Sequence, residues 1–151
     1  MKMLRSGLLI TWVFCFCRTS FASDAGLSYH FTVTDRPDLN RFILTVKSTD
    51  PRPMCLYTDK WPNRLGQLHF GSTWVSLTAR GVTLRAHDSN FGVCRGDASC
   101  YIYLPPGGTL TAFIGYEQFG DPAEIAALAE RELKFPIALF RCPKKVHRAK
   151  G

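Results

Sequence analysis

Hydrophobic and polar residues alternate along most of the chain beyond its first 25 residues. Residues 27–33 (LSYHFTV) and 41–47 (RFILTVK) each place every second side chain on an apolar face, and the turn-forming sequence TDRPDLN lies between them. A period of two is typical of strands with one buried face, so the pattern predicts two neighbouring antiparallel strands. Further short strands are predicted at 54–58, 72–78, 81–87, 100–104, 109–116 and 135–142.

One segment, GDPAEIAALAEREL, departs from this alternation. Asp121 can cap a helix, Pro122 occupies the first helical position, and Glu124 follows three residues after the cap. These are strong signals of a helix start, and we predict a helix over 122–133. About seven short strands with frequent turns and one helix before the last strand predict a mainly β fold, an antiparallel immunoglobulin-like β-sandwich.

The N-terminal sequence MKMLRSGLLITWVFCFCRTSFAS has the order of a secretory signal peptide: basic residues, an apolar run, then small residues. Its apolar run is shorter than the roughly 20 residues that a membrane-spanning helix needs. We therefore predict a signal peptide over 1–22, a single domain over 23–142 and a flexible basic tail over 143–151. The mature protein is expected to be periplasmic or secreted, with no stable membrane anchor after cleavage.

The formal net charge of the whole chain is +7. The predicted signal peptide carries three of the basic residues and no acidic ones, and the predicted tail carries four basic residues. The domain between them is therefore neutral. Binding to nucleic acid normally shows as a basic patch on a folded domain, so we expect no nucleic-acid partner.

Two of the six cysteines lie within the predicted signal peptide, and four remain: Cys55, Cys94, Cys100 and Cys142. An even number in an exported chain indicates disulfides, and sequence alone allows three connectivities. We favour Cys94 with Cys100 and Cys55 with Cys142, because the second pair closes a long loop and would stabilise the fold by roughly 4 kcal/mol. The chain lacks the close cysteine pairs of a zinc site, so no metal and no cofactor is expected.

The sequence CRGDASC places Arg95 and Asp97 inside the small ring that Cys94 and Cys100 would close. The tripeptide resembles the Arg-Gly-Asp loops of disintegrin-like and matrix proteins, which would imply adhesion to a receptor. A stapled turn explains the cysteines and the glycine without a receptor, and we favour that interpretation. The ring still remains a candidate contact surface, because rigid loop tips often carry recognition.

Two further stretches are candidate contact surfaces. The loop LYTDKWPNRLG contains Tyr57, Trp61 and Arg64, and Trp, Tyr and Arg are enriched in the residues that dominate binding energy at interfaces. An equally weighted alternative is that Trp61 folds back over the edge of the core. Glu117 lies in the approach to the predicted helix. The candidate partner-binding residues are Trp61, Arg64, Arg95, Asp97 and Glu117.

No catalytic motif is present. The sequence contains no nucleophile elbow, no zinc-protease motif and no phosphate-binding glycine loop. Its four histidines are scattered, and the adjacent pair His87 and Asp88 would face opposite sides of a strand. We therefore predict no catalytic residues and no enzyme. A ligand-binding protein or hydrolase stays open as an alternative, which a pocket joining His87 to distant acidic residues would favour.

The segment YIYLPPGGTLTAFIGYEQFGD joins a strand ending in Leu-Pro-Pro-Gly-Gly to an alternating strand and Tyr-x-x-Phe. It resembles the second half of small exported bacterial β-sandwich proteins of the periplasmic inhibitor and immunity type, over about a third of the mature chain. The resemblance implies a non-catalytic module that binds a protein partner, such as a secreted or periplasmic hydrolase. The alternative is a structural or adhesive cell-surface module that uses the RGD-containing loop.

Overall fold

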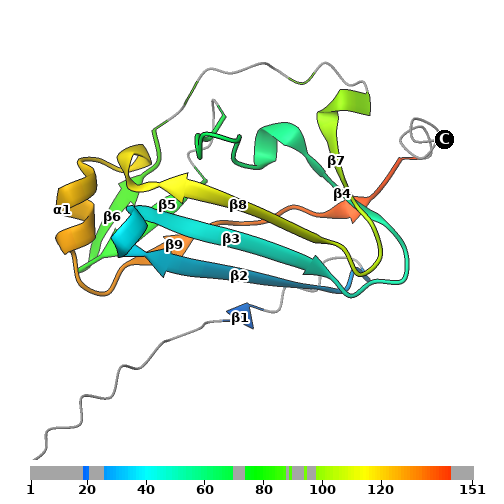
Figure 1. Ribbon diagram of the computed structural model, residues 1–151, viewed down its shortest axis with the longest axis horizontal. Coiled ribbons are helices and arrows are strands. Elements are labelled where there is room, and N and C mark those ends of the chain that lie inside the picture. Colours follow the sequence, from blue (N-terminus) through cyan, green and yellow to red (C-terminus); the bar gives the residue numbers. More distant parts are fainter. Residues whose placement is uncertain are drawn as a thin grey trace, which may run out of the picture.

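The computed structural model describes residues 19–20, 26–69, 74–87, 89, 94 and 98–143. Within them the chain is mainly β, with three antiparallel sheets and one α-helix (Figure 1). This confirms the predicted fold class, an antiparallel sandwich. Figure 1 shows the long strands β2 (Tyr29–Arg36), β3 (Arg41–Ser48) and β8 (Thr109–Gly115) side by side. The helix α1 (Pro122–Ala127) lies at one end of the molecule, and the strands β4 (Met54–Tyr57) and β7 (Tyr101–Leu104) lie toward the other.

The largest sheet has the strand order β1-β2-β3-β8. Its strands are β1 (Thr19–Ser20), β2 (Tyr29–Arg36), β3 (Arg41–Ser48) and β8 (Thr109–Gly115). The 3-10 turn η1 (Pro37–Leu39) joins β2 to β3, which pair antiparallel from Tyr29 opposite Ser48 to Arg36 opposite Arg41. The two strands predicted to be neighbours are therefore neighbours.

Two three-stranded sheets complete the described fold, with the orders β10-β4-β7 and β6-β5-β9. Their strands are β4 (Met54–Tyr57), β5 (Ser76–Ala79), β6 (Val82–Arg85), β7 (Tyr101–Leu104), β9 (Glu132–Lys134) and β10 (Phe140–Arg141). Arg80 and Gly81 have φ angles of 49° and 77°, which fit a tight hairpin turn between the paired strands β5 and β6. Short 3-10 turns occur at η2 (Thr58–Lys60), η3 (Ala98–Cys100) and η4 (Tyr116–Gln118).

Buried side chains from all three sheets form one core. Phe42, Leu44 and Val46 alternate on the inner face of β3, as the sequence pattern predicts. The Phe135 ring joins distant parts of this core, because its centroid lies 5.8 Å from that of Trp61 and 5.3 Å from that of Trp74. Burial of such rings contributes a large share of the stability of a small domain.

The helix is shorter than predicted. Its start is correct, since the Asp121 carboxylate accepts hydrogen bonds from the backbone N–H groups of Ala123 and Glu124. However, α1 (Pro122–Ala127) ends well before residue 133. Glu130 has a φ of 55°, which an α-helix does not allow, and residues 132–134 form β9 against β5 instead.

The last strand is also shorter than predicted. The segment 135–142 was expected to be extended throughout, but only β10 is a strand, while the residues before it cross from the β6-β5-β9 sheet to the β10-β4-β7 sheet. Phe135 and Leu139 are buried along this crossing, which explains their apolar spacing without strand pairing. Strand β1 lies inside the predicted signal peptide; most of that peptide, and the predicted tail from residue 144, lie outside the described residues.

Candidate binding surface

The structure contains two disulfides, Cys55–Cys142 and Cys94–Cys100, with Cα–Cα distances of 4.9 Å and 5.1 Å. These are the two pairs expected from the sequence. Disulfides form and persist in oxidising environments, so this pairing indicates such a compartment. In the described part of the chain, no helix is long and apolar enough to cross a membrane.

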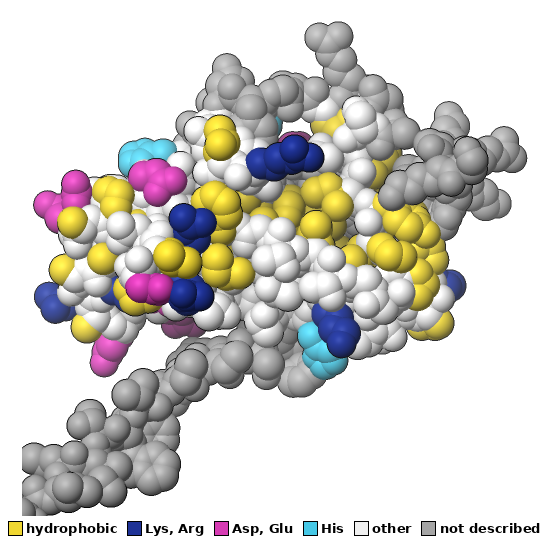
Figure 2. Space-filling view, in the orientation of Figure 1, with side chains coloured by type: hydrophobic (Ala, Val, Ile, Leu, Met, Phe, Trp, Pro, Cys, Tyr) yellow, Lys and Arg dark blue, Asp and Glu magenta, His cyan; other side chains and the backbone are white. Residues whose placement is uncertain are grey.

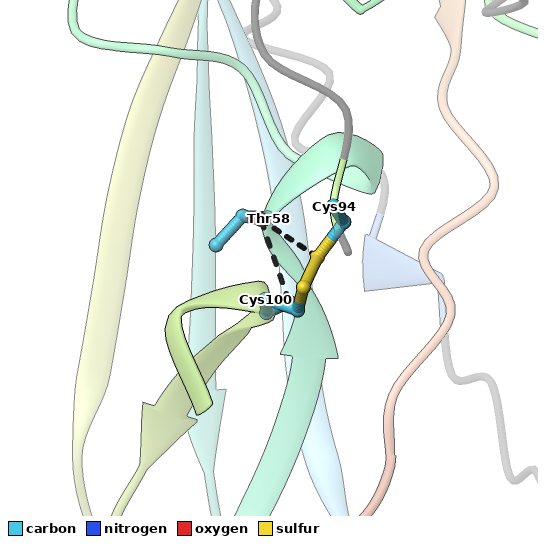
Figure 3. Close-up of a disulfide and its surroundings, with 3 residues drawn as sticks. All are labelled: Thr58, Cys94 and Cys100. Carbon is cyan, nitrogen blue, oxygen red and sulfur yellow. Dashed lines mark hydrogen bonds between the residues drawn. A yellow bond between two sulfur atoms is a disulfide. The ribbon is translucent and has the colours of Figure 1, made fainter. Parts of the chain in front are cut away.

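The Cys94–Cys100 ring is fixed at its base to η2 (Figure 3). The hydroxyl of Thr58, the first residue of η2, hydrogen-bonds to the carbonyl oxygen of Cys100 at 3.4 Å and to Sγ of Cys94 at 3.7 Å. The ring is therefore held both covalently and by hydrogen bonds to a separate part of the chain. The candidate residues Arg95 and Asp97 lie outside the described residues.

An open pocket of about 270 Å³ lies beside this ring, lined by Tyr57, Asp59, Lys60, Cys94 and Cys100. Oδ1 of Asp59 is buried and has no hydrogen-bond partner within the described residues. The ammonium group of Lys60 lies 5.6 Å from the centroid of the Trp74 ring. A buried acceptor without a donor is costly, and the lining of the pocket offers an acceptor group in Asp59 and a donor group in Lys60.

A cluster of aromatic rings covers the outer side of the β10-β4-β7 sheet next to the pocket. Tyr57 is paired with Tyr101 across the sheet, and the ring of Phe140 lies 4.7 Å from that of Tyr57 and 5.9 Å from that of Tyr101. The Tyr57 side chain is 42% exposed, whereas its neighbours in the strand, Met54 and Leu56, point into the core. We call Tyr57, Tyr101 and Phe140 the aromatic face.

Sequence reasoning placed Tyr57 in a candidate contact loop but missed the other two members of the aromatic face, Tyr101 and Phe140. The sequences YIYL and MCLY predict strands, and they also show that both faces of these strands carry large apolar or aromatic side chains. The face of a sheet that is exposed to water normally carries polar residues. A tyrosine on the outer face of each of two strands therefore indicates a candidate contact surface. The sequence does not indicate that Phe140 belongs to the aromatic face, because this follows only from the pairing of β10 with β4.

Trp61 was a candidate contact residue, and the structure corrects this. Its side chain is only 4% exposed, and its ring makes an edge contact with the Phe135 ring at 5.8 Å. The alternative interpretation, in which Trp61 covers the edge of the core, is the one that the structure shows. Trp61 anchors the loop that carries Arg64 and is not available to a partner.

Arg64 is exposed at the tip of a tight turn. The backbone N–H of Gly66 donates to the carbonyl of Asn63 at 3.0 Å, and the Asn63 side chain accepts hydrogen bonds from the N–H groups of Leu65 and Gln67. Leu65, beside Arg64, is 68% exposed. The turn therefore presents a basic and an apolar side chain from a backbone that is fixed by its own hydrogen bonds.

This turn lies next to the segment that carries Glu117. The N–H of Leu68 donates to the side-chain oxygen of Gln118 at 3.4 Å, and Gly66 packs so closely on the Phe113 ring that a Cβ there would lie 2.3 Å from it. Glu117 is exposed in η4. The structure therefore brings together the segments of Arg64 and Glu117, two of the five predicted contact residues.

Charged side chains form no large area of one sign among the described residues on the side of the molecule drawn in Figure 2. Basic and acidic groups are interspersed there, and hydrophobic side chains gather in a band. This agrees with the neutral domain calculated from the sequence and offers no electrostatic footprint for nucleic acid on that side.

The described pocket does not include His87, whose backbone N–H donates to the carbonyl of Gln118 at 2.6 Å. Asp88 lies outside the described residues. No group of three or more side chains that could hold a metal ion occurs within the described ranges. Comparison of the chain with protein-family models and with curated proteins finds no match.

Proposed function

We propose that this protein is an exported, non-catalytic module that binds another protein, and that its partner is a secreted or periplasmic hydrolase which it neutralises. The observation that carries the proposal is the aromatic face, in which Tyr57 is exposed and Tyr101 and Phe140 are half-buried, beside the Cys94–Cys100 disulfide. Tyrosine supplies a large contact area with a polar tip at a low entropic cost, and it is enriched in the residues that dominate interface energy.

The scaffold supports this use. The Cys55–Cys142 disulfide joins β4, which carries Tyr57, to the segment after β10, the strand that carries Phe140, and the Cys94–Cys100 disulfide lines the pocket beside Tyr57. A surface that is already ordered loses little conformational entropy on binding, so more of the contact energy appears as affinity. Inhibition of a hydrolase requires only that such a surface cover or fill the cleft of the enzyme.

The test begins with capture of partners by the tagged mature protein from its native cells, followed by mass spectrometry. We expect a stoichiometric exported hydrolase whose purified form loses activity when the purified protein is added. The double variant Tyr57→Ala/Tyr101→Ala should weaken this inhibition about tenfold or more, because truncation of central aromatic contacts is the costliest kind. Val82→Ala, which also truncates an exposed apolar side chain, is the matched control.

Two results would count against the proposal. If the captured hydrolase keeps full activity in the presence of the protein, neutralisation is wrong. If only copies of the protein itself or structural components of the envelope are captured, the structural or adhesive alternative replaces it.

A further inference from the structure

We infer that the pocket beside the Cys94–Cys100 ring binds a neutral polyhydroxylated ligand, a sugar unit of a glycan, which stacks on the ring of Tyr57 and hydrogen-bonds to Asp59 and Lys60. This goes beyond the proposed function, since a glycan and a protein partner are different ligands. The inference depends on the polar groups of the pocket, on its exposed ring and on its size.

The polar groups of the pocket call for a ligand that both donates and accepts hydrogen bonds. Asp59 lines the pocket, and its carboxylate only accepts hydrogen bonds, so a ligand there must supply a donor. Lys60 also lines the pocket, and an ammonium group only donates. A basic ligand would satisfy Asp59 but would be repelled by Lys60, and an acidic ligand would meet the opposite conflict. A hydroxyl group does both tasks without charge, which favours a polyol.

The ring of Tyr57 supplies the apolar contact. The face of an aromatic ring carries partial negative charge, so it attracts the weakly positive C–H groups on one side of a pyranose. Tyr57 is 42% exposed. The centroid of its ring lies 5.4 Å from that of Tyr101 and 4.7 Å from that of Phe140, and these contacts hold the ring in place. The aromatic face continues the stacking surface along the sheet and past the pocket, so it can contact more than one sugar unit.

The size of the pocket suits one sugar ring of a longer chain. Its volume of about 270 Å³ lies just below the range of roughly 300–1,000 Å³ that holds drug-sized ligands. Because the pocket is open and adjoins the aromatic face, the neighbouring units of a glycan can extend outward from it. An extended neutral oligosaccharide therefore fits better than a compact ligand.

The experiment is isothermal titration calorimetry of the mature protein with three neutral trisaccharides: cellotriose, maltotriose and triacetylchitotriose. We expect at least one of them to bind at millimolar concentration or below. Asp59→Asn and Tyr57→Ala should each weaken that binding about tenfold, because a hydrogen bond to a charged group and an aromatic contact are each removed. Tyr57→Phe keeps the ring and should keep most of the affinity.

Matched controls separate binding from folding. Asp38→Asn removes an exposed carboxylate elsewhere, and Val82→Ala removes an exposed apolar side chain of β6, so both should bind like the unmodified protein. Every variant is checked by its urea unfolding midpoint. If Tyr57→Ala does not fold, Asp59→Asn together with Tyr57→Phe still tests the site.

Several outcomes would overturn the inference: no heat with any of the three trisaccharides, unchanged affinity in both Asp59→Asn and Tyr57→Ala, or tighter binding of trilysine or trigalacturonate than of a neutral sugar. Capture of a hydrolase through the aromatic face, combined with no sugar binding, would overturn this inference and leave the proposed function standing. Sugar binding without any captured hydrolase would do the reverse.

Discussion

At the scale of single residues, the ion pair of Asp50 and Arg141 is the contact whose effect should depend most strongly on pH. Both oxygens of the Asp50 carboxylate accept hydrogen bonds of 2.7 Å from the Arg141 guanidinium, and the backbone N–H groups of Arg52 and Ser28 donate to them as well. The Arg141 guanidinium, followed by these N–H groups, holds the pKa of Asp50 well below its usual range.

The sign of the pH effect follows from this lowered pKa. The carboxylate is ionised in the folded protein at a pH where the unfolded chain is already protonated, so its contribution to stability is complete above the unfolded pKa of about 3.9 and is lost as the pH falls below it. We predict that Asp50→Asn lowers the free energy of unfolding at pH 7. It should also flatten the decrease of stability between about pH 4 and pH 2. Urea unfolding across this range measures both effects.

The exposed pair Arg36 and Asp38 provides the control for Asp50. Their side chains are 47% and 58% exposed, and exposed ion pairs contribute little to stability. Asp38→Asn should therefore leave the free energy of unfolding at pH 7, and its decrease between about pH 4 and pH 2, nearly unchanged. If the free energy of unfolding falls as steeply between about pH 4 and pH 2 in Asp50→Asn as in the unmodified protein, other carboxylates control acid unfolding.

Residue-scale contacts were the part of the structure that the sequence could least predict. Asp50 and Arg141 are 91 residues apart, and no pattern indicates that they meet. Trp61 shows the same limit, because a tryptophan in a proline-containing loop has the same sequence pattern whether its ring enters the core or faces water. Arg64 and Glu117 were correctly placed on the surface, since charged side chains are rarely fully buried.

At the scale of elements, Arg131 supplies hydrogen-bond donors to the C-terminal end of α1. Its guanidinium donates to the carbonyl oxygens of Ile125 and Ala126 in the last turn of the helix and of Leu128 just after it, and its Nε donates to Asp35 on β2 at 2.8 Å. Asp35 also accepts a hydrogen bond from the buried phenol of Tyr116. Burial and the Asp35 carboxylate raise the pKa of this phenol, so it stays protonated and donates at ordinary pH.

We predict that Arg131→Met lowers the free energy of unfolding by about 2 kcal/mol or more, because several carbonyl oxygens and a partly buried carboxylate lose their donor. Arg36→Met is the control, since it removes an exposed arginine from the same strand that carries Asp35. Chemical denaturation measures both variants. A loss in Arg131→Met no larger than in the control would mean that water replaces the guanidinium at the end of the helix.

The elements themselves were mostly predictable, and the errors have one cause. Alternation located the main strands, and Asp121 with Pro122 located the start of the helix, because these signals are local. The end of the helix and strand β9 were missed, since residues 128–134 leave the helix to make tertiary contacts with Asp35 and β5. A local pattern with high helix propensity is overridden by such contacts.

At the scale of the whole molecule, the two disulfides should differ in their effect on stability. Cys55 and Cys142 are 87 residues apart, whereas Cys94 and Cys100 are 6 apart. In the chain-entropy model, a crosslink stabilises by restricting the unfolded chain, and the effect grows with the length of the closed loop. We predict that Cys55→Ala/Cys142→Ala lowers the free energy of unfolding by about 4–5 kcal/mol, and Cys94→Ala/Cys100→Ala by about 2 kcal/mol.

Binding should show the opposite order, because the two disulfides support different parts of the molecule. The short disulfide holds the ring against Thr58 and lines the pocket, so its removal should weaken capture of the partner at temperatures where the variant is still folded. The long disulfide connects β4 to the chain after β10, but the pairing of β4 with β7 and β10 also orders the aromatic face, so loss of this disulfide should weaken binding less among folded molecules. Urea titration and partner capture on both double variants separate the two roles. Equal losses of binding among folded molecules would show that the disulfides act together on one surface.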